Sequence, residues 1–384
     1  MNDALIVSAT RSPIGRAFKG SLTELRPTDL AATLTRAAID AVPGLDPDSI
    51  EDVILGCAQP AGEQGYNMAR VVSLLSGLHN VPGTTVNRYC ASSLQSLRMA
   101  FHAIRAGEGD VFVAGGVECV SRFGWGKSDG MPNTMNPRFE APEMPAIYML
   151  MGETAERVAD AEQVSREDMD AWACTSQNRA VAARESGVFA REITPVTTPG
   201  GATIDRDDCP RPGTTMEKLA GLRTVFRDDG RVTAGNACPL NDGAAAAVVM
   251  SSARAAELGV VGRARIIATA VSALDPAIMG MGPVEATRRV LARAGMTIDD
   301  VDLVELNEAF AAQVVPCMRH LAIPAEKLNV HGGAIALGHP FGMTGVRLVT
   351  TLLNALETKD GTIGLATLCV GGGQGMAMLI ERVG

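Results

Sequence analysis

The stretch Val86-Asn87-Arg88-Tyr89-Cys90-Ala91-Ser92-Ser93 decides the fold, because it carries the chain from a strand into a long helix through a cysteine. Helical spacing follows over residues 93–106, and an apolar strand at 110–114 ends in Gly115-Gly116. Strands that alternate with helices indicate a layered α/β fold. A cysteine at a helix N-terminus faces the positive end of the helix dipole and free N–H groups, which stabilise a thiolate. The pattern predicts a nucleophilic Cys90 exposed at the end of a sheet, with a buried structural thiol as the alternative.

Both ends of the chain show the same order of elements. In the first third, apolar runs predict strands at 4–7 and 52–55, and helical spacing predicts helices at 28–41 and 67–76. In the last third we expect strands at 264–268, 301–304, 328–330 and 362–368, and helices at 283–294, 308–320 and 345–357. Strand, reactive turn, long helix, strand and glycines recur in that order in both thirds. We therefore interpret the fold as a duplicated α/β unit.

Residues 121–241 interrupt this pattern, because they are rich in proline, glycine and charge. Helices are expected around Ala155 and over residues 166–185. A long irregular insertion of this kind indicates a lid or loop domain rather than a third core. Asn241-Asp242-Gly243, followed by alanines, marks the return to the first core. We predict a core domain of residues 1–120 plus 242–262, a loop domain of residues 121–241 and a second core domain of residues 263–384.

The composition argues against several classes of protein. A chain of 384 residues is long enough for two or more cores, and its net charge of -9 argues against nonspecific nucleic-acid binding. Residues 361–380 carry no charge, but their glycine cluster predicts a strand, a turn and a second strand rather than a membrane span. No secretory signal is recognisable. The eight cysteines show neither C-x-x-C nor zinc-like spacing, so we expect no metal site and reduced thiols in the cytoplasm.

Three further residues are candidates for chemistry. His339 ends the segment Gly332-Gly333-Ala334-Ile335-Ala336-Leu337-Gly338 and precedes Pro340, so glycines allow close approach of a ligand beside a stiff turn. A histidine held there can accept the cysteine proton, although a lone loop histidine is more often a satisfied side chain. Cys369 precedes Gly371-Gly372-Gly373 and can act as an acid or base beside free backbone N–H groups. Asn307 can orient a water or an oxyanion, or simply cap a helix.

Taken together, these segments resemble the thiolase family. The matching segments follow the family's order along nearly the whole chain: Ala9-Thr10-Arg11-Ser12-Pro13-Ile14-Gly15, 86–90, Thr233-Ala234-Gly235-Asn236, Asn241-Asp242-Gly243, Asn307-Glu308-Ala309-Phe310, 332–340 and Cys369 with its glycines. Each segment alone is a weak signal, whereas all of them in order are specific. The resemblance implies two similar core domains in an α/β/α/β/α layered arrangement, an inserted loop domain, and assembly as a homodimer or homotetramer.

The resemblance also implies an acetyl-CoA C-acyltransferase that cleaves 3-ketoacyl-CoA thiolytically. Cys90 would be the acylated nucleophile, His339 the base that deprotonates it, and Cys369 the acid that protonates the acetyl-CoA enolate. One oxyanion site would use His339 and a water held by Asn307, and the other the backbone N–H groups of Cys90 and Gly371. The resemblance implies acyl-CoA and coenzyme A as substrates and no permanently bound cofactor.

The family's contacts with coenzyme A map onto six residues of the expected loop domain: Met151, Arg211, Lys218, Leu219, Arg223 and Cys238. The chain departs from the best-known biosynthetic thiolases at Cys238 and Lys218, where serines are common. It departs again at Leu150, which stands where short-chain biosynthetic thiolases place a histidine beside the acyl pocket. Leucine favours apolar contact, and the methionine-rich segment 131–151 adds adaptable apolar side chains. We therefore expect a degradative enzyme that prefers chains longer than acetoacetyl.

Three alternatives stay open. A biosynthetic acetoacetyl-CoA thiolase would use the same residues. Condensing ketosynthases share the fold but usually lack the second catalytic cysteine, so Cys369 argues against them. A non-catalytic thiolase-like lipid carrier would tend to have lost a catalytic residue, whereas Cys90, Asn307, His339 and Cys369 are all present.

Overall fold

The computed structural model describes residues 3–122 and 135–384, and two halves of similar content make up its core. The first half contains β1 (Ala4–Arg11), β2 (Gly15–Arg16), α1 (Pro27–Asp40), β3 (Asp52–Gly56), α2 (Met68–Leu75), β4 (Gly83–Val86), α3 (Ser92–Ala106), β5 (Val111–Cys119) and β8 (Asn241–Ser251). The second contains β9 (Ala264–Ala273), α8 (Gly282–Ala294), β10 (Leu303–Leu306), α9 (Ala311–Leu321), α10 (Ala334–Leu337), α11 (Thr344–Lys359), β11 (Ile363–Val370) and β12 (Gln374–Arg382).

The two halves share one strand order, which confirms the predicted duplication. In the order β4-β3-β5-β8-β1, β3 is parallel to β4 and β5, while β8 is antiparallel to β5 and β1. In the order β10-β11-β12-β9, β10 is parallel to β11, while β12 is antiparallel to β11 and β9. Leu328 makes a single parallel bridge with Val304 where β4 stands in the first half. A two-residue antiparallel pairing of β1 with β9 joins the halves into one mixed sheet.

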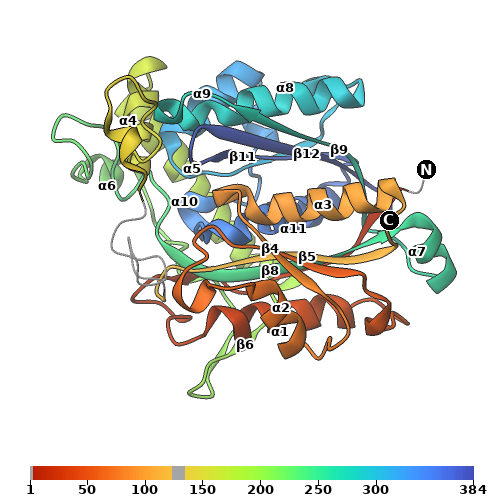
Figure 1. The fold of residues 1–384 in the computed structure, drawn as a ribbon. Coiled ribbons are helices and arrows are strands. Elements are labelled where there is room, and N and C mark those ends of the chain that lie inside the picture. The colour runs from red at the N-terminus through yellow and green to blue at the C-terminus, as the bar shows by residue number, and fades with distance from the viewer. Residues whose placement is uncertain (1–2, 123–134) are drawn as a thin grey trace.

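Five layers result from this duplication (Figure 1). The helices α1 and α2 cover the outer face of the first half, and α8 and α9 cover that of the second. The helices α3 and α11 lie between the halves and pack against each other. Every residue of β5 and β8 is buried, and so is every residue of β11 except the first. Strands covered on both faces become continuous apolar runs, which explains why the sequence shows no alternation there.

Two strands extend further than predicted. Strand β5 continues through Gly115 and Gly116 to Cys119, because glycine there allows close contact rather than ending the strand. A Cβ atom at Gly116 would lie 2.0 Å from the carbonyl oxygen of Gly342. Strand β11 runs to Val370, so Cys369 lies inside the strand, opposite Gly375, and not after it. The predicted strand, turn and strand at 361–380 are confirmed, and Gly372 and Gly373 adopt φ of +74° and +76° in the turn.

Two other expectations were wrong in detail. The expected strand at 328–330 is reduced to the Leu328 bridge, because Asn329 takes a left-handed φ of 46°. The helix expected from residue 308 begins at Ala311, because Phe310 is still extended and its neighbour Ala309 accepts a bond from the Cys238 N–H. None of the helices in the described ranges is both long and apolar enough to cross a membrane.

The segment between β5 and β8 contains α4 (Met151–Ala161), α5 (Arg166–Glu185), a small hairpin of β6 (Val196–Thr197) and β7 (Thr203–Ile204), and α6 (Met216–Ala220). The two helices predicted here are confirmed. Helix α5 packs against α9 and α10 of the second half, and α4 also contacts α9. Figure 1 shows α4 and α6 together at one side of the layered core. The boundaries at residues 121, 242 and 263 stay predictions.

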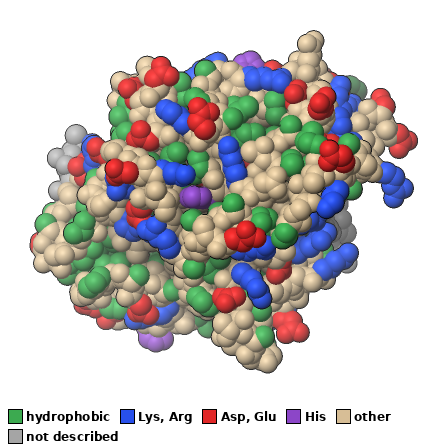
Figure 2. Space-filling view, turned by 180° about the vertical axis from the view of Figure 1, so that it is seen from behind, with side chains coloured by type: hydrophobic (Ala, Val, Ile, Leu, Met, Phe, Trp, Pro, Cys, Tyr) green, Lys and Arg blue, Asp and Glu red, His purple; other side chains and the backbone are tan. Residues whose placement is uncertain are grey.

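Basic and acidic side chains are mixed on the face shown in Figure 2. A surface of mixed sign fits the small net negative charge of the sequence.

The helix α7 (Ser252–Leu258) follows β8 and leads into the second half.

Candidate active site

Cys90 lies in a short 3-10 turn, Tyr89–Ala91, directly before α3. The turn is held by the Ser92 hydroxyl, which accepts from the Arg88 N–H at 2.9 Å and donates to the Tyr89 carbonyl. The backbone N–H groups of Gly371 and Cys90 itself face the thiol sulfur. Contrary to the expectation of an exposed thiol, Cys90 is only 9% exposed. Burial outweighs these two N–H groups and raises the pKa of Cys90 to about 12, so the free site holds a thiol rather than a thiolate.

His339 is buried, and neighbouring residues hold both its backbone N–H and its ring nitrogen Nδ1. Its N–H donates to Asn241 Oδ1 at 2.9 Å, and its ring Nδ1 lies 2.6 Å from Thr344 Oγ1. The Thr344 hydroxyl has one hydrogen, which it donates to the Pro340 carbonyl at 2.8 Å. Both contacts are hydrogen bonds only when Nδ1 carries the ring proton. The lone pair of the neutral imidazole is therefore on Nε2.

Asn307 lies at the opposite edge of the imidazole ring, next to Nε2. Its Nδ2 is 3.3 Å from His339 Nε2, so that the amide donates to the imidazole lone pair. Its Oδ1 is buried and has no protein partner. The alternative role of helix cap does not apply, because Phe310 is the N-cap residue of α9. A buried acceptor without a partner is the kind of atom that an ordered water satisfies.

Burial, together with a smaller effect of the positive charge of Arg347, lowers the pKa of His339 to about 3. Cys90 and His339 are therefore both neutral at physiological pH. This arrangement differs from a preformed thiolate–imidazolium pair. It leaves the imidazole able to accept a proton and makes the transfer depend on what enters the site.

Cys369 is fully buried in β11, beside the glycine turn. Burial raises the pKa of the Cys369 thiol well above its usual value, and the nearby sulfurs of Cys90, Cys317 and Cys238 raise it further. Cys238, expected to contact coenzyme A, thus lies near Cys90 and Cys369, and burial, followed by the effect of Cys90, raises its pKa. Cys369 and the Gly371 N–H therefore lie near Cys90, Asn307 contacts His339, and the turn Phe341–Met343 that follows His339 packs against the turn Tyr89–Ala91 that carries Cys90.

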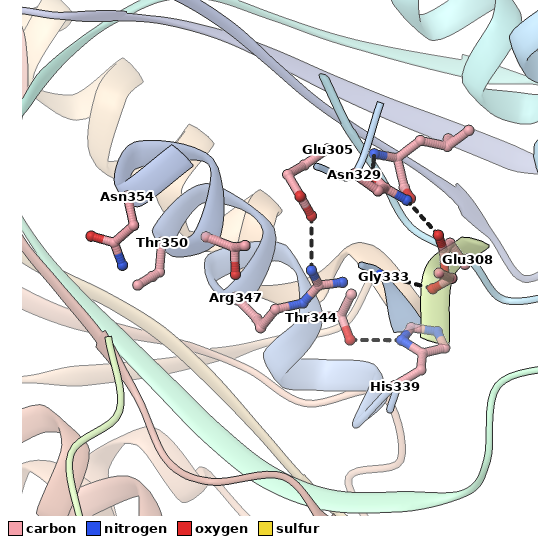
Figure 3. Close-up of polar contacts among 12 residues, drawn as sticks. Glu305, Glu308, Asn329, Gly333, His339, Thr344, Arg347, Thr350 and Asn354 are labelled. Atoms are coloured by element: carbon pink, nitrogen blue, oxygen red, sulfur yellow. Dashed lines mark hydrogen bonds and ion pairs between the residues drawn. The ribbon is translucent and has the colours of Figure 1, made fainter. Parts of the chain in front are cut away.

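Two buried glutamates hold the site together, and the sequence did not single them out. Glu308 accepts from Trp172 Nε1 and Ser176 of α5, from Asn329 Nδ2 and from the Ile335 N–H (part of this cluster is drawn in Figure 3). It therefore ties the segment around α5 to the strand end before Asn307 and to the loop before His339. The sequence signal was present in Asn307-Glu308-Ala309-Phe310, but only the fold shows its partners.

The second glutamate, Glu118, joins the two halves near Cys90. It accepts from the N–H groups of Ala58, Gln59 and Gly342 at 2.9, 3.2 and 2.9 Å, and from Gln64 Nε2 at 2.7 Å. Burial raises its pKa to about 7. Gly342 follows the His339 turn, so this carboxylate fixes that turn against β3 of the first half.

Among the residues expected to contact coenzyme A, Cys238 lies near Cys90 and Cys369. Arg211, Lys218 and Arg223 are exposed, and no carboxylate within the described ranges pairs with them. Leu219 is buried, and with Arg211 it lines a hollow of about 30 Å³ that is closed by Gly235, Pro239 and Ile335. Met151 begins α4 and is half-buried.

Apolar side chains surround the glycine turn next to Cys90. The position of a Cβ on Gly372 would be 3.7 Å from the Tyr89 ring and 3.8 Å from Ile147. Tyr89 is 40% exposed, and Tyr148 and Leu150, beside Ile147 in the chain, are exposed as well. Of the methionine-rich segment, residues 131–134 lie outside the described ranges. The described part places apolar groups close to the turn beside the reactive thiol.

The fold defines the class of the protein as a duplicated five-layer α/β protein with a cysteine at the start of a central helix. Comparison with known proteins matches residues 4–253 to the thiolase N-terminal domain and residues 260–382 to the thiolase C-terminal domain. The chain is 47% identical over 402 residues to a 3-oxoadipyl-CoA/3-oxo-5,6-dehydrosuberyl-CoA thiolase of Escherichia coli, covering all of both chains. It is also 47% identical over 393 residues to a 3-ketoacyl-CoA thiolase of Shewanella denitrificans, again covering all of both.

Among solved structures, the acetyl-CoA acetyltransferase of Bacillus anthracis superposes with a TM-score of 0.92 at 38% identity, covering 100% of this chain and 99% of that one. The chain belongs to the thiolase family and is an acyltransferase.

Proposed function

We propose that the protein cleaves 3-ketoacyl-CoA with coenzyme A, giving acetyl-CoA and an acyl-CoA two carbons shorter through an acyl-enzyme on Cys90. The observation that carries this proposal is the state of His339. Its neutral ring carries the lone pair on Nε2, because Thr344 fixes the proton on Nδ1, and the Asn307 amide competes for this lone pair only through a long contact of 3.3 Å. The base is therefore ready to accept the proton of a buried thiol.

The proton and electron movements in this proposal balance. The Cys90 proton moves to His339 Nε2 while the sulfur attacks the 3-keto carbon. The bond between C2 and C3 breaks, and its electron pair becomes the enolate of acetyl-CoA, which takes the Cys369 proton at C2. A second coenzyme A thiol then gives its proton to the Cys369 thiolate and attacks the acyl carbon. Cys90 leaves as a thiolate and recovers its proton from His339.

Two sets of donors support the charged oxygens in these steps. The backbone N–H groups of Cys90 and Gly371 already converge on the Cys90 sulfur, where a tetrahedral intermediate forms. The unpartnered Oδ1 of Asn307 supports a water that would complete the second set together with His339. Loss of one such donor typically costs about a hundred- to a thousandfold in rate.

Coenzyme A in this proposal lies over α5 and α6. Arg211, Lys218 and Arg223, which pair with no carboxylate in the described part of the chain, offer cations for its phosphates. Cys238 and Met151 face the thioester end of the ligand.

The eight cysteines are all free, which fits our assignment to the reducing cytoplasm.

For the acyl chain we propose a degradative preference, for groups longer than acetoacetyl. The relatives do not decide this, because a 3-oxoadipyl-CoA thiolase and a 3-ketoacyl-CoA thiolase are equally similar to the chain. The apolar groups of Tyr89 and Ile147 at the glycine turn favour an apolar chain.

We further propose that two copies of the chain associate through the first half. Strand β4 is the end strand of the sheet on the side of the first half and is only partly buried, so its edge is open to another strand. Next to it, α2 exposes Val71, Leu74 and Leu75 on one face, and Tyr66 just before the helix is 98% exposed. An apolar face beside an open edge fits a second copy of the same surface.

Trapping the acyl-enzyme tests the proposed function. The protein is incubated with 3-ketooctanoyl-CoA without free coenzyme A, and its peptides are analysed by mass spectrometry. We expect a hexanoyl mass on the peptide that contains Cys90 and none in the Cys90→Ala variant. Acylation that persists in Cys90→Ala, or that occurs on Cys369 alone, would contradict the proposal.

A further inference from the structure

Two hydrogen-bonded side chains form a bridge between the turn that carries Cys90 and the glycine turn after β11. Arg88 Nη1 donates to Gln374 Oε1 at 2.9 Å, and Gln374 Nε2 donates to the carbonyl of Gly371 at 3.2 Å. Arg88 and Gln374 are 286 residues apart in the sequence, so only the fold brings them together. Neither side chain has a part in the proposed mechanism.

Each end of the bridge is next to one of the two N–H groups that face the Cys90 sulfur. Arg88 precedes Cys90 by two residues and is the N-cap residue of its 3-10 turn. Gln374 bonds the carbonyl of Gly371, whose N–H is the second of the two donors. Strand β11 packs against the Cys90 turn, and a Cβ at Gly371 would lie 3.4 Å from Tyr89 Cγ. The bridge therefore links the two turns that supply the oxyanion donors.

The glycine turn has little rigidity of its own. Gly371, Gly372 and Gly373 follow one another, and glycine has more backbone freedom than any other residue. The far end of the turn is held by the Leu274 N–H, which donates to the Gly373 carbonyl at 2.8 Å. At the Gly371 end, the Gln374 amide takes the corresponding role. Donors that stabilise a developing charge must be fixed before the reaction, so the turn needs this support.

Arg88 is oriented by neutral partners rather than by an ion pair. Its Nε donates to Gln95 Oε1 of α3 at 3.1 Å, while Nη1 reaches Gln374. It is half-buried, and no carboxylate among the described residues pairs with it. A partly buried cation with neutral partners gains little stability from its charge. Arg88 also borders a hollow of about 350 Å³, so its contact with Gln374 does not serve to fill a core.

We propose that Arg88 and Gln374 are positioning residues for the oxyanion site at Cys90. Their bridge holds the Gly371 N–H in place beside the Cys90 N–H. This inference rests on the proposed function. The bridge acts whenever a tetrahedral intermediate forms on Cys90, which happens in both acyl transfers. It does not act in proton exchange at C2 of acetyl-CoA, which proceeds through Cys369 and makes no bond to Cys90.

Two substitutions at Gln374 test the bridge. Gln374→Met removes both of its hydrogen bonds, whereas Gln374→Glu keeps a contact with Arg88 but lacks the amide hydrogen that Gly371 accepts. We expect kcat and kcat/KM to fall together by about tenfold or more in both variants, because the supported donor acts in the transition state. Exchange of the C2 protons of acetyl-CoA with deuterated solvent keeps the wild-type rate. Slower exchange in step with kcat would indicate a general distortion and overturns the inference, as does a Gln374→Glu variant with wild-type kcat.

The acyl-enzyme gives a direct signature of the oxyanion site. Wild type and variants are acylated with excess octanoyl-CoA that carries carbon-13 at the thioester carbonyl, and difference infrared spectroscopy records the carbonyl stretch on Cys90. Hydrogen bonds to the carbonyl oxygen weaken the double bond and lower this frequency. We therefore expect a higher frequency in both Gln374 variants than in the wild type. An unchanged frequency overturns the inference.

Arg88→Met tests the other end of the bridge, and Arg98→Met is its matched control. Arg98 is also half-buried and pairs with no carboxylate in the described part of the chain, but its Nε bonds Thr269 Oγ1 at 3.2 Å. We expect the loss of kcat in Arg88→Met and wild-type kcat in Arg98→Met. The double variant of Arg88→Met and Gln374→Met should be no slower than the slower single variant, because both changes remove one contact. Equal losses in Arg88→Met and Arg98→Met, or losses that multiply in the double variant, overturn the inference.

Urea unfolding of each variant shows whether it is folded before its activity is compared. If Gln374→Met does not fold, Arg88→Met decides by kcat, proton exchange and the infrared frequency, because it leaves the glycine turn unchanged in sequence. Wild-type protein that never acylates Cys90 removes the proposed function instead. Normal acylation of Cys90 with wild-type kcat in Arg88→Met and Gln374→Met removes the inference alone.

Discussion

At the scale of single residues, the site is built from neutral groups in places where charge is costly. Burial raises the pKa of Cys90 to about 12 and lowers that of His339 to about 3. The predicted helix start directly after Cys90 is confirmed, but the sequence pattern did not predict that burial outweighs the helix dipole. Burial comes from segments far away in the sequence, such as the glycine turn at 371–373 and the His339 turn. The local sequence pattern around Cys90 therefore cannot predict how deeply Cys90 is buried.

The neutral histidine predicts a pH dependence of stability. Between pH 6.5 and pH 3 the unfolded chain binds a proton at residue 339 that the folded chain does not, so unfolding becomes easier as the pH falls. From pH 6 to pH 4 this single group should lower the free energy of unfolding by about 2 kcal/mol. Urea unfolding of the wild type and of His339→Gln measures it, because all other titrating groups cancel in the comparison. Equal pH dependence of the two proteins would show that folding does not lower the pKa of His339.

At the scale of elements, the contact between α3 and α11 fixes the Cys90 turn against the His339 turn, which carry the proposed nucleophile and base. Helix α3 begins two residues after Cys90, and α11 begins five residues after His339. The two helices touch where Gly345 meets Leu94, and the Ser93 hydroxyl accepts from the Val346 N–H at 3.0 Å. The first turns of both helices are therefore locked together, and the reactive side chains with them.

This contact predicts that replacing Gly345 by alanine lowers the stability of the protein, although alanine usually stabilises a helix. Alanine in a helix is normally about 1 kcal/mol more favourable than glycine. Here a Cβ would lie 2.1 Å from the Leu94 backbone nitrogen, so Gly345→Ala should lower the free energy of unfolding by about 1–3 kcal/mol and reduce kcat. Gly200→Ala is the control, because the nearest atom to its added Cβ is 3.8 Å away. Chemical denaturation measures both, and a Gly345→Ala variant as stable as the control would mean that the helices are not in close contact.

The elements themselves were largely predictable, whereas their ends and partners were not. Helices α1, α3, α4, α5, α8 and α11 lie where helical spacing placed them, within a few residues. The errors occur at Gly115-Gly116, where glycine allows close approach to Gly342, and at Phe310, where a bridge to Ala237 delays the helix. Thr344, Glu308 and Glu118 escaped notice for the same reason. Each acts through residues that only the duplicated fold brings near.

At the scale of the whole molecule, the open edge of β4 and the apolar face of α2 predict a dimer. Leu74 and Leu75 are 43% and 53% exposed on that face. We expect light scattering at micromolar concentration to give twice the mass of one chain, and Leu75→Asp to shift the protein toward the monomer. Val261→Asp is the control, because Val261 is 73% exposed between α7 and β9, outside both β4 and α2. A wild-type monomer, or a Leu75→Asp dimer as stable as the control, would contradict the proposed surface.

The substrate preference is also a property of the whole molecule, because the glycine turn after β11, the turn before α3 and the segment before α4 meet at the site. Ile147 and Tyr89 supply apolar contact there, worth about 0.8 kcal/mol for each buried methylene, or roughly fourfold in kcat/KM. We expect 3-ketooctanoyl-CoA to be cleaved with at least about tenfold higher kcat/KM than acetoacetyl-CoA, and 3-oxoadipyl-CoA to be less favourable because its carboxylate would meet apolar groups. Ile147→Ala should reduce the advantage of the long chain while leaving acetoacetyl-CoA cleavage nearly unchanged, because the short substrate does not reach Ile147. A clear preference of the wild type for acetoacetyl-CoA would overturn the degradative assignment, and a preference for 3-oxoadipyl-CoA would show that a cation outside this apolar group receives the carboxylate.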